Sequence, residues 1–222
     1  MRIRRKKNLE IRIEKVSENL IISDFDIMNV NDAVKDKKFL DYNRLFNNNN
    51  KVSLEIGCGK GLFAVEMAKR HPDTNFIAVE LLSNIIVMAA ELAKKEKLKN
   101  LYFFNCGADY LPRYIRPDSI KNIYLNFSPP FPGDRYKNRR LTKDKLVEDY
   151  YSFLEKDGCI YQKTDDKTFF DFSFEQLKKY KFEVFDISEK IRNNEIENVK
   201  TEYENKFISL GIPVYYLLAK KL

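Results

Sequence analysis

The residues best suited to chemistry lie in a glycine-rich turn, Ser53-Leu-Glu-Ile-Gly-Cys-Gly-Lys-Gly61. Its three glycines allow a tight turn and a close approach of the backbone to a ligand. A helix predicted to begin at Leu62 would point its unpaired N–H groups and its positive dipole end toward that ligand. Glu80 ends the next predicted strand, where a carboxylate can accept hydrogen bonds from ribose hydroxyls. The spacing therefore predicts a site for a nucleotide-like ligand.

Two nucleotide-like ligands fit such a turn, NAD(P) and S-adenosylmethionine. The dinucleotide fingerprint G-x-G-x-x-G requires a third glycine at position 62, where this chain has Leu62. Glu55, two positions before the first glycine, places a carboxylate beside the charged portion of the ligand. A carboxylate repels a pyrophosphate but attracts the ammonium and sulfonium groups of S-adenosylmethionine. The sequence therefore favours S-adenosylmethionine.

The charge distribution indicates a polyanionic partner. The chain of 222 residues has a formal net charge of +7, and two short segments account for the excess. Residues 1–15 hold seven basic and two acidic side chains, and residues 133–145 hold six basic and two acidic ones. Such patches are typical of proteins that bind nucleic acids. One histidine and three widely spaced cysteines argue against a metal centre and a disulfide framework, and no apolar run is long enough to cross a membrane.

The elements that must position the glycine turn alternate between strands and helices. Residues 1–15 show no steady period, so residues 1–28 are predicted to be a basic N-terminal arm and residues 29–222 a single domain. The alternation predicts an α/β fold in which a mostly parallel, seven-stranded sheet carries helices on both faces. Strands are predicted at 52–56, 75–79, 101–105, 120–127, 158–163, 182–187 and 214–219, and helices at 29–46, 62–70, 83–96, 143–156 and 168–180.

Four further motifs follow the glycine turn in order along the chain. They are Asn126-Phe-Ser-Pro-Pro-Phe-Pro132, Arg135-Tyr-Lys-Asn-Arg-Arg-Leu141, Lys163-Thr-Asp-Asp166 and Thr201-Glu-Tyr-Glu204. With Glu55 and Glu80, these motifs make the chain resemble the bacterial tRNA (guanine-N7-)-methyltransferases over residues 50–222. The basic N-terminal segment is also similar to that family.

The resemblance implies a Rossmann-like class I methyltransferase that uses S-adenosylmethionine, and no metal, to methylate N7 of a guanine in the variable loop of tRNA. It implies a cytoplasmic monomer or homodimer whose partner is tRNA and not a membrane. The residues implied at the donor site are Glu55, Gly57, Gly59, Gly61, Glu80, Cys106 and Asp109. Those implied at the tRNA site are Arg135, Arg139, Arg140, Asp165, Thr201, Glu202, Tyr203 and Glu204.

The chain departs from the family pattern at two positions near the expected site of methyl transfer. Pro129 stands where the family commonly has an aspartate, and Gly133 stands where it has a basic residue. Guanine N7 has a lone pair and no proton, so the lost aspartate is not an obligatory base. We hypothesise that Asp134, Asp165 or Asp166 partly replaces its negative charge. The alternative is a non-catalytic or weakly active tRNA-binding homologue.

Overall fold

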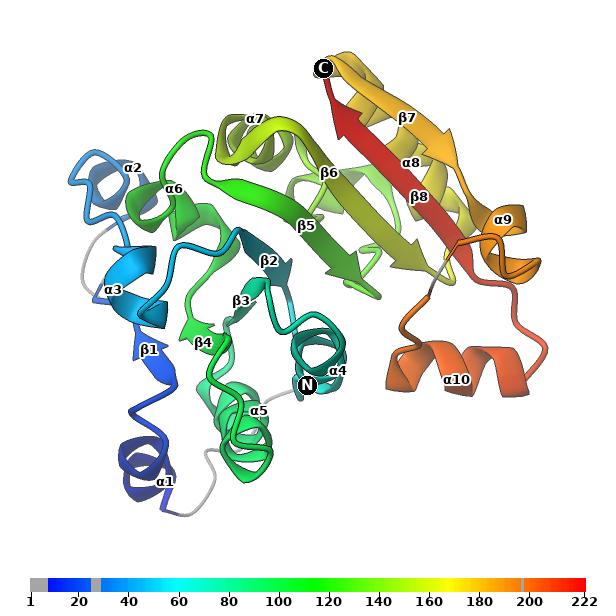
Figure 1. Ribbon diagram of the computed structural model, residues 1–222. Coiled ribbons are helices and arrows are strands. Elements are labelled where there is room, and N and C mark those ends of the chain that lie inside the picture. Colours follow the sequence, from blue (N-terminus) through cyan, green and yellow to red (C-terminus); the bar gives the residue numbers. More distant parts are fainter. Residues whose placement is uncertain (1–7, 25–28, 197) are drawn as a thin grey trace.

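The computed structural model describes residues 8–24, 29–196 and 198–222, which form one eight-stranded sheet with helices on both faces (Figure 1). The strand order is β1-β4-β3-β2-β5-β6-β8-β7, and within this described sheet only β8 runs antiparallel to its neighbours. The strands are β1 (Leu20–Ile22), β2 (Val52–Ile56), β3 (Asn75–Glu80), β4 (Leu101–Asn105), β5 (Ile120–Asn126), β6 (Leu154–Thr164), β7 (Phe182–Asp186) and β8 (Tyr215–Lys221).

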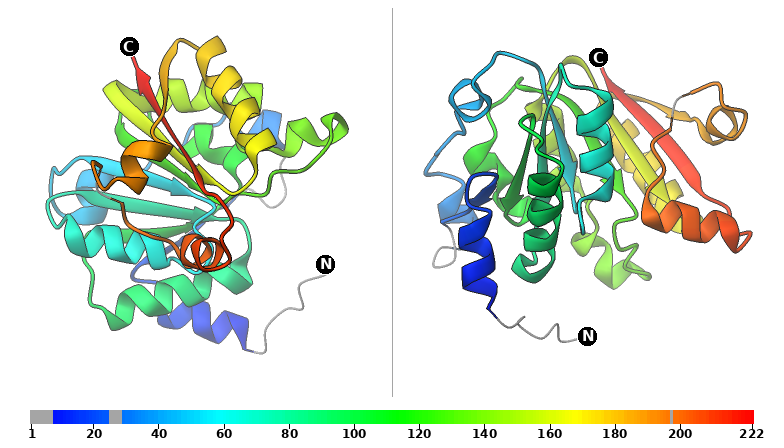
Figure 2. Two further views of the ribbon diagram at one scale, coloured as in Figure 1. Left: turned by 90° about the vertical axis from the view of Figure 1, so that its right-hand side faces the viewer. Right: turned by 60° about the horizontal axis from the view of Figure 1, so that its bottom comes forward.

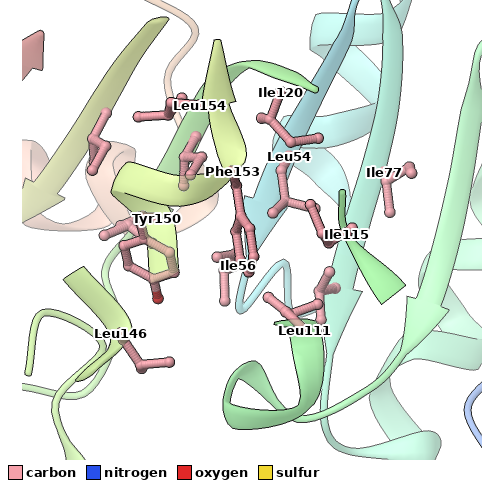
Figure 3. Packing of buried hydrophobic residues seen from close by; sticks show 14 of the residues in the cluster. Leu54, Ile56, Ile77, Leu111, Ile115, Ile120, Leu146, Tyr150, Phe153 and Leu154 are labelled. Atoms are coloured by element: carbon pink, nitrogen blue, oxygen red, sulfur yellow. The ribbon is translucent and has the colours of Figure 1, made fainter. Parts of the chain in front are cut away.

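Separate hydrophobic clusters lie on the two faces of the sheet. On one face α1 (Leu9–Lys15), α4 (Leu62–Arg70) and α5 (Ser83–Lys95) share a core with β3 and β4. On the other face α6 (Leu111–Tyr114), α7 (Asp144–Phe153) and α8 (Lys167–Lys179) pack on β2, β5 and β6. Figure 3 shows Tyr150 and Phe153 of α7 beside Ile56 of β2. The remaining helices are α2 (Val30–Ala33), α3 (Tyr42–Phe46), α9 (Ser188–Arg192) and α10 (Glu202–Ser209).

The strand order decides where the site can form. From β2 the chain continues to β3 and β4 on one side, and β5 and β6 lie on the other side of β2. Ligands of open parallel sheets bind at such a reversal, beyond the carboxyl ends of the strands. The glycine turn after β2, Glu80 at the end of β3, and the ends of β5 and β6 therefore meet at one edge.

The predicted α/β class, with a mostly parallel sheet and helices on both faces, is confirmed, but the predicted number of strands is wrong. The additional strand is β1, which pairs with β4 through Leu20 and Phe103. The prediction that residues 1–15 lack regular structure is also wrong for residues 9–15, which form α1. Leu9 is buried, and the Arg12 guanidinium binds the Glu91 carboxylate of α5 at 2.6 and 2.7 Å.

Both elements escaped prediction because they are short and lie among charged residues, and because contacts with α5 and β4, which are distant in sequence, stabilise them. Residues 1–7, the most basic part of the predicted arm, lie outside the described residues. The division into residues 1–28 and 29–222 stays a prediction.

The single helix predicted over residues 29–46 is wrong. The segment forms two short helices, and each begins at its own capping residue: Asn29 accepts a hydrogen bond from the Asp32 N–H, and Asp41 accepts one from the Arg44 N–H. The helix predicted to end at Lys156 ends instead at Phe153, because Leu154 enters the sheet opposite Ile120. None of the described helices is long and apolar enough to span a membrane.

Substituting Gly61 with alanine should destabilise the fold strongly. A Cβ there would lie 2.6 Å from the Cβ of Ala89 and 2.9 Å from the Phe103 ring, and Gly61 has a φ of +77°. Overpacking and the left-handed backbone together should cost about 2–4 kcal/mol of unfolding free energy, measured by urea denaturation. Gly59→Ala is the matched control, because its φ is also positive but its Cβ meets no atom within 4 Å. Equal losses in the two variants would contradict this packing role.

Candidate functional site

The glycine turn is joined to β3 by its own backbone. The N–H groups of Gly57 and Cys58 both donate to the Val79 carbonyl, at 2.8 and 2.9 Å. All three glycines of the turn have positive φ, which favours glycine. Gly61 packs against α5, whereas the space beside Gly59 is open. The turn is therefore closely packed on one side and accessible to a ligand on the other.

Glu80 lies beside that open space. Its carboxylate accepts hydrogen bonds from the Gly59 N–H at 3.2 Å and from the Leu82 N–H at 2.9 Å. Asn105, at the end of β4, donates to the Glu80 and Leu81 carbonyls and accepts a hydrogen bond from the Ser83 hydroxyl. The loop that carries Glu80 is thus positioned from the neighbouring strand, and the side chain stays partly accessible.

Glu55 is buried at the end of β2. Its Oε1 accepts a hydrogen bond from the Asn126 amide at 2.9 Å, and its buried Oε2 has no protein partner. Burial raises the pKa of this carboxyl to about 7, against the opposing effects of Asn126 and of the Lys163 ammonium. An unpartnered buried carboxylate oxygen is costly, so the site is suited to a ligand that supplies a cation or a hydrogen-bond donor.

In the described part of the chain, the other two residues implied at the donor site do not hydrogen-bond to the glycine turn or to Glu55 through their side chains. Cys106 is buried, and burial raises the pKa of its thiol to about 12, so that it is a neutral group within the core. Asp109 is half-buried and forms an ion pair with Lys143 at 2.5 Å. The structure thus brings Glu55, Glu80 and the glycines together, and places Cys106 and Asp109 at the margin of this group.

The loop after β5 carries Pro129. Phe127 and Phe131, which flank the two prolines, have φ values of 48° and 44°, a left-handed conformation that is rare for aromatic residues. The buried Arg140 guanidinium holds the loop by donating to the Pro130 and Phe131 carbonyls, at 2.8 and 3.2 Å. Strain maintained by such contacts is common at functional sites.

The three arginines implied at the tRNA site differ in accessibility. Arg135 and Arg139 are exposed in the 3₁₀ turn Asp134–Arg139, where they stack on the Tyr136 and Phe131 rings at 4.5 and 4.8 Å. Arg140 is buried and is occupied by backbone carbonyls and the Phe172 ring. The first two guanidinium groups are therefore accessible at the surface, whereas the third holds the loop.

The acidic residues also separate into two groups. Asp166 caps α8 by accepting a hydrogen bond from the Phe169 N–H at 2.7 Å, whereas Asp165 is half-buried beside it. In the Thr201–Glu204 motif, Thr201 and the fully buried Glu204 form a capping box at the start of α10, and Glu202 and Tyr203 are exposed. Glu202 pairs with Lys60 of the glycine turn at 3.2 Å, which places the start of α10 beside that turn.

Sequence analysis assigned no role to two buried residues of this site, Asn126 and Lys163. They are paired at the ends of β5 and β6, and Glu55 lies beside them at the end of β2. The available signals were a polar residue at the end of an apolar strand and the first position of a quoted motif. Among the described residues no group of three or more His, Cys, Asp or Glu side chains is arranged to hold a metal ion.

Comparison with known sequences assigns the chain to a family. A model described as a putative methyltransferase matches residues 49–217. The tRNA (guanine-N(7)-)-methyltransferase of Clostridioides difficile is 35% identical over 222 residues, which cover 100% of this chain and 99% of the relative. The enzyme of that name from Bacillus subtilis is 38% identical over 175 residues, or 78% of this chain and 82% of the relative. The chain belongs to the tRNA (guanine-N(7)-)-methyltransferase family.

Solved structures with a similar fold are also methyltransferases. The 16S rRNA methyltransferase KamB has a TM-score of 0.60 at 12% identity, and the match covers 83% of this chain and 95% of that one. A 30S ribosomal A1408 methyltransferase from an uncultured bacterium has a TM-score of 0.57 at 14% identity, with 83% and 96% covered. At these identities the likeness concerns the fold alone, and it agrees with the class I methyltransferase fold of the family.

Glu55→Gln should change how the stability of this family member depends on pH. The pKa of Glu55 rises from 4.5 to about 7 on folding, so its protonated form favours the fold below pH 4.5, and this contribution is lost as the pH rises through 7. Between pH 5 and pH 8 the unfolding free energy of the variant should rise relative to the wild type by about 2–3 kcal/mol. Urea denaturation of the ligand-free protein measures it.

The control is Glu66→Gln on α4, at a partly exposed carboxylate paired with Arg70, where burial is much smaller. Parallel pH profiles for Glu55→Gln and the wild type would show that burial does not perturb Glu55.

Proposed function

We propose that the protein transfers a methyl group from S-adenosylmethionine to N7 of a guanine in the variable loop of tRNA. Membership of the family over the whole chain carries this proposal. Because tRNA is its substrate, we place the protein in the cytoplasm. The predicted monomer or homodimer stays a prediction.

The residues around the glycine turn fit the donor. The open space beside Gly59 allows S-adenosylmethionine to approach the backbone of the glycine turn closely. The unpartnered Oε2 of Glu55 is suited to the ammonium group of the donor. The Glu80 carboxylate accepts hydrogen bonds from the N–H groups of Gly59 and Leu82. It lies at the end of β3, where an acidic side chain can accept hydrogen bonds from the ribose hydroxyls of a nucleotide-like ligand. When bound, the donor supplies an electrophilic methyl group on a sulfonium.

The chemistry asks little of the protein beyond positioning. The lone pair of guanine N7 forms the new N–C bond while the S–C bond breaks, its electron pair stays on sulfur, and the positive charge passes to the purine. No proton must leave N7, so no general base is needed. The protein has to align N7 with the methyl group and stabilise a purine that becomes cationic.

Because Pro129 stands where the family commonly has an aspartate, another carboxylate must stabilise the cationic purine. Of the three candidates, Asp166 is occupied as the cap of α8 and Asp134 is exposed on the 3₁₀ turn. Asp165 is half-buried and directly follows β6, which pairs with β5, and β5 in turn pairs with β2. We therefore propose Asp165 as the carboxylate that faces the guanine.

The surface beside this site has the chemistry of an RNA-binding surface. Arg135 and Arg139 are exposed, and their guanidinium planes stack on aromatic rings. Phosphates supply most of the affinity for nucleic acids, whereas an unstacked target base is recognised by aromatic and polar groups. We propose that these arginines bind the tRNA backbone, and that Tyr203 and Glu202 lie near the extruded guanine.

Methyl transfer is tested with radiolabelled S-adenosylmethionine and unmodified tRNA, followed by nucleoside analysis. We expect N7-methylguanosine at many turnovers per enzyme. Asp165→Asn should lower kcat about 100- to 1,000-fold, the range for a lost stabilising group, while Asp166→Asn should leave kcat and stability nearly unchanged, because an asparagine side-chain oxygen also caps a helix. Binding of tRNA by the wild type without any transfer of label would contradict the proposal and support the binding-only alternative.

The arginine surface is tested by the salt dependence of tRNA binding. In a filter-binding titration, Arg135→Ala combined with Arg139→Ala should reduce the slope of log Kd against log salt by about 2, because each lost phosphate contact removes about 0.9. The control combines Lys51→Ala and Lys99→Ala, two exposed lysines at the amino ends of β2 and β4. An equal loss of slope in the control would show that the cations act only through total charge.

A further inference from the structure

Helix α10 is held in an unusual way. It lies at the end of β6 and the start of β8, apart from the helices that cover the sheet (Figures 1 and 2). Only one of its eight residues is buried, and that residue is the charged Glu204. Its apolar contacts come from two half-exposed or exposed rings: Phe207 packs on Phe127, with ring centroids 5.6 Å apart, and Tyr203 lies 6.2 Å from the Phe127 ring. Phe207 also packs on the small buried cluster of Ile187, Val214 and Tyr216. Apolar packing of α10 is therefore limited to a small cluster, and buried polar contacts also hold the helix in place.

The Glu204 carboxylate supplies these polar contacts. Its Oε1 accepts hydrogen bonds from the Tyr216 hydroxyl at 2.7 Å and from the Asn198 amide. Its Oε2 accepts hydrogen bonds from the Thr201 N–H at 3.3 Å and from the Lys163 ammonium at 2.9 Å. A fully buried carboxylate with four hydrogen-bond donors is held in one position, because losing a donor leaves a buried charge uncompensated. Glu204 therefore fixes the position of the first turn of α10.

Lys163 connects the Glu204 carboxylate to the sheet. Besides Glu204, its buried ammonium donates to the Asn198 side-chain oxygen at 2.5 Å and to the Val199 carbonyl at 2.7 Å. Thus one β6 side chain holds both the segment that leads into α10 and the cap of the helix itself. A cavity of about 210 Å³ lies beside Lys163 and is lined by Phe63, Tyr161 and Ile196 among others, so packing around the segment is incomplete on that side.

We propose that Lys163 is a positioning residue for the acceptor RNA: by tying α10 to β6, it places Glu202 and Tyr203 beside the glycine turn. The 3.2 Å pair between Glu202 and Lys60 shows that the helix start reaches that turn. This inference rests on the proposed function for its substrate, but the link between Lys163 and α10 is a property of the free protein.

Lys163 also acts electrostatically on Glu55, so its removal alone affects both substrates. A second variant separates the two effects. Tyr216→Phe removes one neutral donor to Glu204, with its ring retained, and leaves the Lys163 charge in place. If Lys163→Met fails to fold, Tyr216→Phe still tests the proposal. The matched control is Lys167→Met, an exposed lysine that pairs with Asp171 on α8.

The first measurement is hydrogen exchange of residues 198–209 in the free protein. Exchange should be faster in Lys163→Met by about tenfold or more and in Tyr216→Phe by less, and unchanged in Lys167→Met. The second is steady-state kinetics. The KM for tRNA should rise about tenfold in Lys163→Met and about threefold in Tyr216→Phe, with kcat at saturating tRNA within about threefold of wild type. In Tyr216→Phe the Kd for S-adenosylmethionine should not change.

The proposal would be overturned by unchanged exchange of residues 198–209 in folded Lys163→Met, or by faster exchange with an unchanged KM for tRNA. A kcat loss at constant KM would also contradict it, because a merely positioning group for RNA should act on KM. If the wild type proves inactive, the proposed function fails, whereas the exchange data and tRNA binding by filter assay still decide the role of Lys163.

Discussion

The structure depends on a row of polar groups buried at the ends of three parallel strands. Glu55, Asn126 and Lys163 end β2, β5 and β6, and Glu204 of α10 extends the row. Burying charge is costly unless each group is hydrogen-bonded or paired. Most of the groups satisfy one another, but Oε2 of Glu55 and Oδ1 of Asn126 have no hydrogen-bond partner among the described residues. Both atoms lie at the strand ends near the glycine turn, where a ligand can supply the missing interactions.

The same constraint explains why the loops around the site are well placed without much apolar burial. Arg140 is buried under the proline loop and satisfies two of its carbonyls, and Asn105 does the same for the loop after β3. Guanidinium and amide groups of this kind hold backbone that no regular structure pairs. The loop that carries Pro129 therefore keeps a defined shape even though it lacks the carboxylate common in the family. Arg140 maintains this shape, although its positive charge alone would suggest that it binds RNA.

Prediction succeeded where one local pattern suffices. Apolar runs bounded by turn residues located β2 and β4 to the residue, and helical spacing located α4. It failed for α1, β1 and α10, whose few apolar residues become meaningful only once a neighbour covers them. Sequence analysis also assigned Arg140 the same role as Arg135, and Glu204 the same role as Glu202. The reason is that residue type and position in a motif do not show whether a charged side chain faces solvent or the core.

The sequence by itself determined the fold class, the glycine turn and the family, because glycine spacing, strand-end carboxylates and ordered motifs are local properties of the chain. Only the tertiary structure decided which charged residues are available to ligands. Strands distant in sequence meet at one edge of the sheet, and there burial and hydrogen bonding turn Lys163, Arg140 and Glu204 inward while leaving Arg135, Glu202 and Tyr203 exposed. That division follows from the cost of desolvating a charge, which depends on every element packed around it.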